Sequence, residues 1–312
     1  MMKKVSIVCA AMMMLAACSQ NQMTATATVT VTKSDSAGIT FEIAKNYFFK
    51  NDQEIPASPK ITTAEEFDRL FGMAAVMGKN GQPTEIDFTK KFVIAIVMPV
   101  TNLATEIKPV RLEEQGDKLY CFYDAKVGNA QSYSTQPMSL IILDRKYADK
   151  TIVMINEQVT DYYAALDRFM TEQIAGHYAK GEYSVAASDV VAVNDEDTTD
   201  IRIWGDFWVY NYKQAGDTLK CVSGGSHPGL IHICQKGKYF YVSQFEQVED
   251  GAGFLPSAKR IFGEYFESFQ IHHSDADERE RNRAELLRAF VRDHGLTATM
   301  YQDYGWPAKD LR

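Results

Sequence analysis

Apolar positions alternate with polar ones over several short stretches in the first half of the chain. Ile39–Ile43 alternates as a half-buried strand does, and further runs rich in β-branched and aromatic residues are separated by turn residues. Thr62 and Glu65 form a capping box that opens a helix. This pattern predicts one helix followed by an antiparallel meander, within a domain of residues 38–158. The predicted strands of the meander are Lys91–Val97, Glu106–Leu112, Lys118–Tyr123, Met138–Leu143 and Thr151–Ile155.

The pattern restarts near residue 160, where a second helix begins. Thr160 or Asp161 caps this helix, whose apolar positions recur at spacings of three and four residues. Two more helices are predicted later, a short one near Ser257–Phe262 and a long one at about Ala276–His294. We therefore predict a second domain over residues 159–312. Its predicted strands are Tyr183–Val193, Ile201–Tyr212, Thr218–Val222, Leu230–Cys234 and Tyr239–Phe245.

Both halves combine strands that pair with their neighbours and a few helices. The predicted fold class is therefore α+β, with two domains that are each a mainly antiparallel sheet with flanking helices. Helices around a curved antiparallel sheet favour an α+β roll for the second domain, NTF2-like or cystatin-like in shape. Such folds host unrelated functions, so the shape alone assigns no activity.

The start of the chain predicts export. Lys3 and Lys4 precede the uncharged apolar run Val5–Ala16, which is shorter than the roughly 20 residues of a membrane-spanning helix. The run ends in Leu15-Ala16-Ala17-Cys18, which resembles the lipobox of bacterial lipoproteins. That resemblance implies a signal peptide over residues 1–17 and a diacylglyceryl group on the thiol of Cys18. The alternative is an ordinary cleaved signal with a chance cysteine.

Residues 18–37 are small and polar, and we interpret them as a flexible tether. The alternative is that Thr28–Thr32, where Thr and Val alternate, pairs as an edge strand. No later stretch is long and apolar enough to span a bilayer, so the acyl chains on Cys18 are the predicted anchor in the lipid bilayer. Ser19 resembles the residues that permit onward transfer to an outer membrane. The predicted location is thus the cell envelope, on the outer membrane where there is one, facing the periplasm or the cell surface.

Composition narrows the class of partner. The formal net charge is −8 and there is no basic run, which argues against nucleic acid, where phosphate neutralisation supplies most of the affinity. With 46% hydrophobic and 12% aromatic residues the chain can bury ample core.

Besides Cys18, the exported part retains three cysteines. Cys221 and Cys234 flank the Gly-rich segment Ser223–Gly229, which we interpret as a hairpin loop. If the hairpin is centred between His227 and Pro228, the two cysteines lie opposite each other, within reach of a disulfide. Other registers leave two buried free thiols. Cys121 is predicted to be a thiol in the core.

Part of the first domain resembles a known family. The stretches that carry the resemblance are Ile61–Phe67, Ile86–Ala95, Gly116–Tyr120 and Thr135–Ile142. Together, residues 60–145 look like the C-terminal domain of PrcB, an accessory subunit of a spirochaete surface protease complex. Asn102-Leu103-Ala104-Thr105 stands where the family tends to carry a Gly-Tyr pair. The resemblance implies binding or stabilisation of a protease complex, not catalysis.

The strand Ile201–Tyr212 has two distinct faces. Its odd positions carry aliphatic residues and one phenylalanine, as a core face does, whereas its even positions are aromatic and polar together. Faces of this second kind bind glycans or peptides, because flat rings stack while hydroxyls, indole N–H groups and a carboxylate orient the ligand. The alternative is that helices cover this face. The candidate ligand-binding residues are Trp204, Asp206, Trp208, Tyr210 and Tyr212.

Two other segments bear on this face. Tyr301–Trp306 is a second aromatic and acidic patch, which is a candidate to dock on the same face. The long helix pairs Asp277 with Arg281 and Arg281 with Glu285 at i, i+4, so it is predicted to present a self-paired solvent face.

Catalytic and metal signals are weak. The segment around Ser226 lacks the Gly-x-Ser-x-Gly pattern of a hydrolase elbow, because Pro228 stands where the pattern requires its second glycine. His272-His273 is expected on an extended segment, where adjacent side chains point apart, so no metal is predicted, and no cofactor. We therefore predict a non-enzymatic binding or accessory protein for a protein or glycan partner. The alternative is an NTF2-like enzyme on a small exported molecule, with Asp206 and Tyr210 as its acid–base pair.

Overall fold

The computed structural model describes residues 38–74 and 81–312. The predicted signal peptide, Cys18 and the tether of residues 18–37 lie outside the described residues. Among the residues that are described, no helix is both long and apolar enough to cross a bilayer. The described residues all belong to one compact unit, and the domain boundary at residues 158 and 159 stays a prediction.

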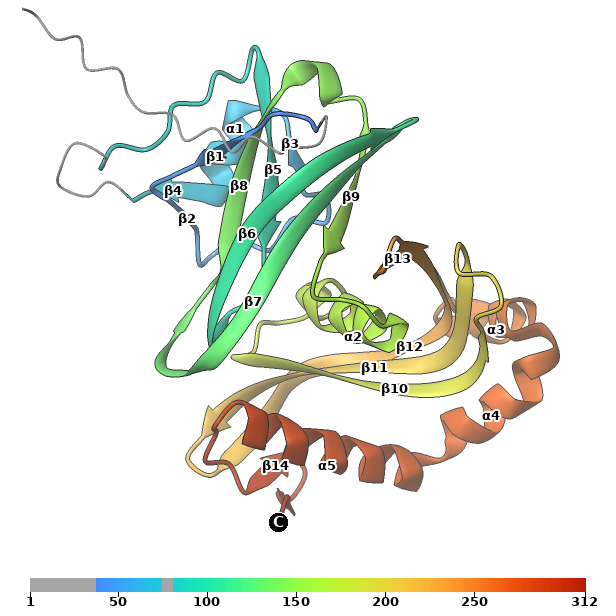
Figure 1. The fold of residues 1–312 in the computed structure, drawn as a ribbon. Coiled ribbons are helices and arrows are strands. Elements are labelled where there is room, and N and C mark those ends of the chain that lie inside the picture. The colour runs from blue at the N-terminus through green and yellow to red at the C-terminus, as the bar shows by residue number, and fades with distance from the viewer. Residues whose placement is uncertain (1–37, 75–80) are drawn as a thin grey trace, which may run out of the picture. The chain divides into compact units, whose positions relative to one another are not determined.

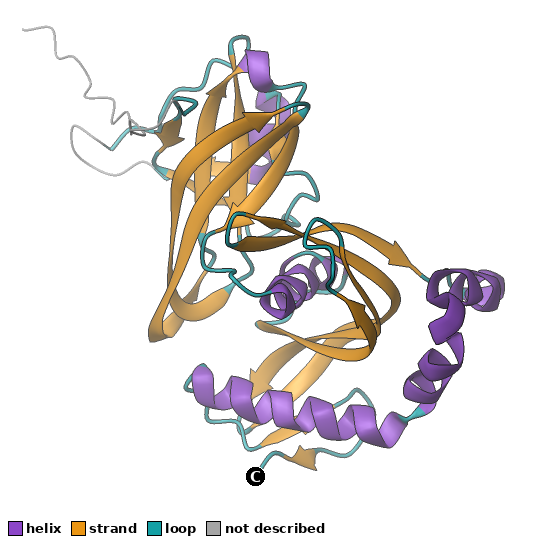
Figure 2. Cartoon of the chain, turned by 45° about the vertical axis from the view of Figure 1, so that its right-hand side comes forward, coloured by secondary structure: helices purple, strands orange, loops and turns teal. Residues whose placement is uncertain are grey.

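The fold class is α+β, as predicted. About 25% of the chain is helix and 46% is strand, and most strand pairs are antiparallel (Figure 2). Each long run of β-branched and aromatic residues that was predicted as a strand lies in a strand.

The first half contains three small sheets. Their strand orders are β1-β8-β5-β3, β6-β7-β9 and β2-β4 (Figure 1). The predicted simple meander is wrong, because β5 pairs with β8 rather than with β6, and β9 runs parallel to β7. The helix cap is also one residue later than predicted, since Thr63 accepts from the amide of Glu66. The elements are β1 (Glu42–Ala44), β2 (Tyr47–Phe49), β3 (Lys60–Ile61), α1 (Ala64–Leu70), β4 (Phe71–Met73), β5 (Lys91–Val97), β6 (Thr101–Gln115), β7 (Lys118–Thr135), β8 (Met138–Asp144), a 3₁₀ turn (Arg145–Tyr147) and β9 (Thr151–Asn156).

The second half is built on one sheet of long strands. Its order is β10-β11-β12-β14-β15, with β13 pairing to β12 as well. Asp161 caps α2 by accepting from two backbone amides, and α5 begins at the predicted residue. The elements are α2 (Tyr162–Glu172), β10 (Tyr183–Asn194), β11 (Ile201–Ala215), β12 (Thr218–Lys236), β13 (Tyr239–Gln247), α3 (Phe254–Phe262), α4 (Phe266–Ser274), α5 (Ala276–Asp293), β14 (Met300–Gln302) and β15 (Lys309–Asp310), with 3₁₀ turns at Ile174–His177, Gly251–Gly253 and Gly263–Tyr265.

Helices cover both faces of this sheet. Figure 1 shows α2 on one side of β10–β12, and α4 and α5 on the other. The aliphatic face of β11 packs against Leu166 and Met170 of α2. The opposite face packs against Ala258 of α3, Phe269 of α4 and Leu287 of α5.

The predicted hairpin between Cys221 and Cys234 is wrong. Both cysteines lie on the single strand β12 and both are free thiols. At about 3.3 Å per residue they lie roughly 40 Å apart along an extended strand, far beyond disulfide reach. The predicted bridge within one chain is therefore wrong as well.

The glycines of β12 serve close packing rather than a turn. A Cβ on Gly224 would lie 2.2 Å from the carbonyl oxygen of Val209, and one on Gly229 would lie 2.3 Å from that of Glu246. Glycine is needed where another backbone approaches this closely, and Gly-rich segments of this kind continue a strand.

Candidate functional site

The five predicted ligand-binding residues do share one face of β11, but this face is mostly covered. Trp204, Asp206, Tyr210 and Tyr212 are 8%, 1%, 7% and 0% exposed. Trp208 alone is only partly buried. The prediction of an open five-residue contact face is therefore wrong, and the alternative of covering helices holds for four of the five.

Trp204 is held by the end of α3. Its indole N–H donates to the carbonyl oxygen of Ile261 at 3.0 Å, and its ring lies 5.0 Å from that of Tyr265. A buried indole needs an acceptor for its N–H group, and this one has it within the protein. Trp204 is thus a core residue.

Asp206 is buried and bonded by two side chains. Ser226 of β12 donates to one carboxylate oxygen at 2.5 Å, and Nδ1 of His273 lies 2.7 Å from the other. A parallel pair lies beside it, because Asp189, the cross-strand partner of Asp206, is 3.0 Å from Nδ1 of His272. These pairs attach α4 to the sheet.

The two histidines are in a helix, not on an extended segment as predicted. His272 and His273 occupy the last turn of α4, and neighbouring residues there project about 100° apart, so both reach the sheet. Among the described residues there is no group of three or more His, Cys, Asp or Glu side chains that could hold a metal ion.

Tyr210 and Tyr212 pack around a buried arginine. Arg283 of α5 is 4% exposed, donates to the hydroxyl of Tyr212 at 2.7 Å, and lies 4.1 Å above the ring of Tyr210. Burial raises the pKa of both tyrosines. No hydrogen bond joins Tyr210 to Asp206 in the described chain, so the structure does not assemble them as an acid–base pair.

Arg283 is neutralised by Asp303. Two guanidinium nitrogens donate to its two carboxylate oxygens at 2.7 and 2.5 Å. This bidentate bond from Arg283 holds the pKa of Asp303 below its usual value. The ion pair also fixes the loop after β14 against the N-terminal half of α5.

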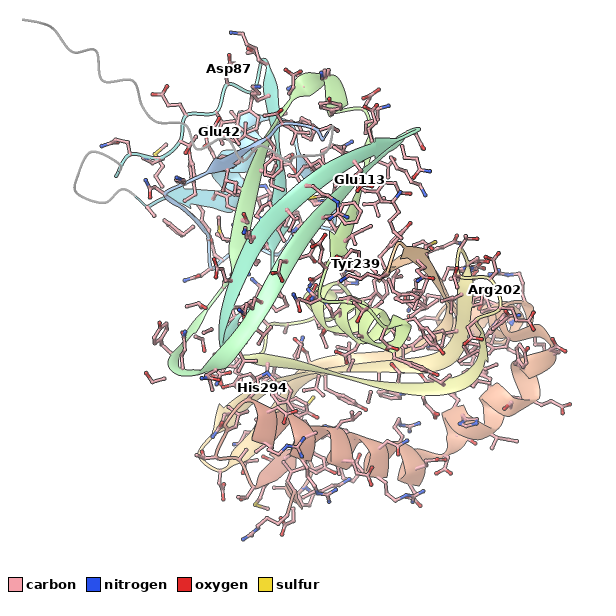
Figure 3. All side chains as sticks on the ribbon, viewed as in Figure 1. Glu42, Asp87, Glu113, Arg202, Tyr239 and His294 are labelled. Atoms are coloured by element: carbon pink, nitrogen blue, oxygen red, sulfur yellow. The ribbon has the colours of Figure 1, made fainter. Side chains whose placement is uncertain are left out.

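Side chains occupy the space between the ribbons of α5 and the sheet. Figure 3 shows them from Arg202, labelled at one end of the sheet, to His294 at the other. The surface beside Trp208 is open to solvent. There, an open groove of about 510 Å³ borders the exposed edge of Trp208; we call it the α5 groove. It is lined by Trp208, Tyr210, Ala276, Asp277, Arg279, Glu280, Arg283, Asp303, Tyr304, Trp306 and Lys309.

The most exposed rings of the α5 groove come from the chain end. Tyr304 is 96% exposed and Trp306 is 69% exposed, on the loop between β14 and β15. The loop has a defined conformation: Gln302 donates to the carbonyl oxygen of Trp306 at 2.8 Å, and Gly305 takes the positive φ of 76° that the turn needs. The predicted docking of Tyr301–Trp306 on the aromatic face is confirmed only for Tyr301, which packs with Tyr210 and Tyr212, and for Asp303, which bonds to Arg283. Tyr304 and Trp306 extend into solvent instead.

Arg279 connects the groove to the Asp206 cluster. Its guanidinium carbon lies 4.6 Å from the centre of the Trp208 ring, and it donates to the carbonyl oxygen of His273 at 3.2 Å. It has no carboxylate partner among the described residues. A cation held flat over an indole retains N–H groups that point outward and can bind a ligand.

The sequence did not identify Arg279 or Arg283, and Ser226 and His273 were considered only for a hydrolase elbow and a metal site that were not predicted. Arg283 sits next to Ala284 and four residues before Leu287, both buried, so helical spacing alone could have placed it on the covered side. The predicted pairs of Arg281 with Asp277 and Glu285 do not form in the described chain, and α5 is not simply a solvent face. No local signal indicated the partners of Ser226 and His273, because both bond to Asp206 across the tertiary fold.

Comparison with protein-family models, with curated proteins and with solved structures finds no match for this chain. The resemblance of residues 60–145 to the PrcB domain, and the NTF2-like or cystatin-like shape of the second half, therefore stay predictions.

Proposed function

We propose that the protein is an exported, lipid-anchored binding protein that holds a protein or glycan partner in the α5 groove. The observation that carries this proposal is the exposure of Tyr304 and Trp306 beside Trp208 and Arg279. Trp, Tyr and Arg are the residue types that dominate binding energy at interfaces. Here residues of these types line the α5 groove, and two of them come from the β14–β15 loop, whose conformation is fixed by hydrogen bonds.

The covered face supports a binding role more than a catalytic one. Its polar atoms are bonded to one another, so they position α4 and α5 and leave few groups for chemistry. Two other parts of the chain support the proposed location and role. The lipobox-like Leu15–Cys18 supports anchoring in a membrane, and the resemblance to the PrcB domain supports an accessory role in a complex outside the cytoplasm.

Anchoring is tested with Cys18→Ala. This variant is expected to leave the membrane fraction and to lose acyl labelling, whereas a Cys121→Ala variant keeps both. A wild-type protein that fractionates as soluble, with another N-terminal residue, would contradict the anchoring.

Binding at the α5 groove is tested by recovering partners from the native envelope. The wild-type protein is compared with Trp306→Ala and with Tyr163→Ala, whose tyrosine is 46% exposed on α2, at the other face of the sheet. Loss of the recovered partner is expected for Trp306→Ala only. Equal recovery with all three proteins would show that the groove is not the contact site.

A second candidate is an enzyme, favoured by one observation. Nδ1 of His273 is 2.7 Å from the buried Asp206, the arrangement that orients a histidine as a general base. Ser226 bonds to Asp206 rather than to His273, so no nucleophile completes a triad. An enzyme should lose about 100-fold or more in turnover on His273→Gln while still binding its substrate. If the protein only binds its partner, neither the wild-type protein nor His273→Gln shows turnover.

A further inference from the structure

We propose that the ligand of the α5 groove is a neutral oligosaccharide, which stacks on Trp306 and Tyr304 and hydrogen-bonds to Arg279 and Asp277. This inference rests on the proposed function and specifies its ligand. Three features of the groove favour this ligand: its aromatic rings are rigidly packed or exposed, its charges balance, and it has almost no aliphatic side chains.

The rings at the base of the groove are rigidly supported. Trp208 and Tyr210 are nearly parallel, with an interplanar angle of 15° and centroids 5.8 Å apart. Tyr210 in turn packs on Arg283, whose guanidinium is fixed by Asp303. Rings that are already ordered lose little entropy when a ligand stacks on them, which favours the weak, repeated contacts of a sugar chain.

The exposed rings extend this platform outward. Tyr304 and Trp306 stand two residues apart on one short loop, and both leave most of their surface to solvent. Exposed aromatic rings present apolar surface to water, and their flat faces match the flat apolar faces of pyranose rings.

The charges of the groove cancel. Three acidic side chains face three basic ones, and most are already paired: Lys309 with Glu280 at 2.8 Å, and Arg283 with Asp303. Arg279 and Asp277 remain without an ion-pair partner among the described residues. One offers donors and the other offers acceptors, which suits the hydroxyl groups of a sugar. A polyanion or polycation would meet as much repulsion as attraction.

An amphipathic helical peptide fits the groove less well. Such peptides insert apolar anchor side chains into a hydrophobic groove. Apart from its rings, the α5 groove offers only the methyl group of Ala276 as an apolar side chain. Its remaining lining is charged, so an aliphatic anchor would desolvate ions without apolar contact in return.

The test titrates the full mature protein in detergent with neutral hexasaccharides of glucose, galactose, mannose, xylose and N-acetylglucosamine. The readout is calorimetry together with tryptophan fluorescence, since two of the three tryptophans of the chain line the groove. At least one sugar is expected to bind, with an affinity that changes less than about twofold between 50 and 200 mM salt because no net charge is neutralised. Trp306→Ala should weaken it about tenfold or more, and Tyr163→Ala should leave it unchanged.

A parallel arm distinguishes the other ligands. It uses an oligogalacturonate as an acidic sugar and an arginine-free, leucine-rich peptide as an apolar one. Binding of either in place of every neutral sugar overturns this inference, as does the absence of any sugar binding. If a partner recovered from the envelope still depends on Trp306 in that case, the proposed function stands and only the ligand class is wrong. If that dependence is lost too, both fail.

Discussion

The two faces of β11 are both covered over most of their length, but for different reasons. On the α2 side Ile201, Ile203, Phe207 and Val209 are at most 1% exposed and make only apolar contacts. On the α5 side the face contains a carboxylate, two phenols and two indoles, and it is buried because α3, α4 and α5 bring matching polar groups to it. The first face is held by burial of apolar area, and the second by burial together with specific pairs.

The difference shows where a binding site can arise. An apolar face closes against a helix whose apolar side chains match it in volume, because it has no polar atom that needs a partner. A polar and aromatic face closes only where each polar atom finds its partner. Along β11 this closure ends at Trp208, where the α5 groove opens. The groove is thus the uncovered part of a face that is otherwise core.

The largest expected effect breaks the apolar face. Phe207 is fully buried against α2 and Phe245, so Phe207→Ala should lower the free energy of unfolding by about 3–5 kcal/mol. Tyr304→Ala, which removes an exposed ring, should change it by less than about 0.5 kcal/mol. Urea unfolding of both variants measures this, and a small loss for Phe207→Ala would show that the α2 side is not the main core.

The next effect breaks the paired face. Arg283→Met removes the partner of Asp303, and we expect a loss of about 2–3 kcal/mol. This is below the value for a fully buried pair, because the Asp303 side chain is about one third exposed and water screens it. Arg281→Met on the same helix is the matched control, with an exposed arginine and no ion pair in the described chain. Similar losses for the two variants would contradict the assigned role of Arg283.

A pH titration sharpens the same contrast. The pKa of Asp303 is lowered by its hydrogen bonds from Arg283, so its contribution to stability is fully present above its usual pKa. That contribution is lost as the pH falls from that value through the lowered one. Wild-type protein should therefore lose more stability than Asp303→Asn between about pH 4 and pH 2. Parallel acid limbs in thermal melts of the two proteins would rule out this linkage.

The smallest expected effect is no change at all. Cys221 and Cys234 are free thiols on one strand, so reduction should leave the melting temperature of the protein unchanged. Mass mapping without reductant should find both alkylated. A Cys221–Cys234 cross-link within one chain would be incompatible with a continuous β12.

The sequence predicted the elements much better than what covers them. The alternation over Ile201–Tyr212 correctly separated the two faces, and the helical spacing after Asp161 and Ala276 correctly placed α2 and α5. It could not show that helices more than forty residues later in the chain would bury Trp204 and Tyr212. The glycines of β12 led to the wrong prediction of a hairpin for a related reason. They are required because neighbouring strands approach them closely, whereas the sequence shows only a Gly-rich run.

The site was predicted in part. Trp208 and the Tyr301–Trp306 segment do meet at the α5 groove, as expected from their shared aromatic and polar character. Arg279 was not identified, because i, i+4 charge spacing on a helix is typical of a solvent face and the stacking partner of Arg279 lies on a strand.

The most direct test of the account is photo-crosslinking in the living cell. Benzoylphenylalanine is placed at Tyr304 in the membrane-anchored protein, and for comparison at Tyr163 on α2. We expect a shifted, light-dependent adduct from position 304 and none from position 163, and the adduct should disappear when Trp306→Ala is added. An adduct from position 163 with none from position 304 would place the contact surface on the opposite face of the sheet and contradict the account.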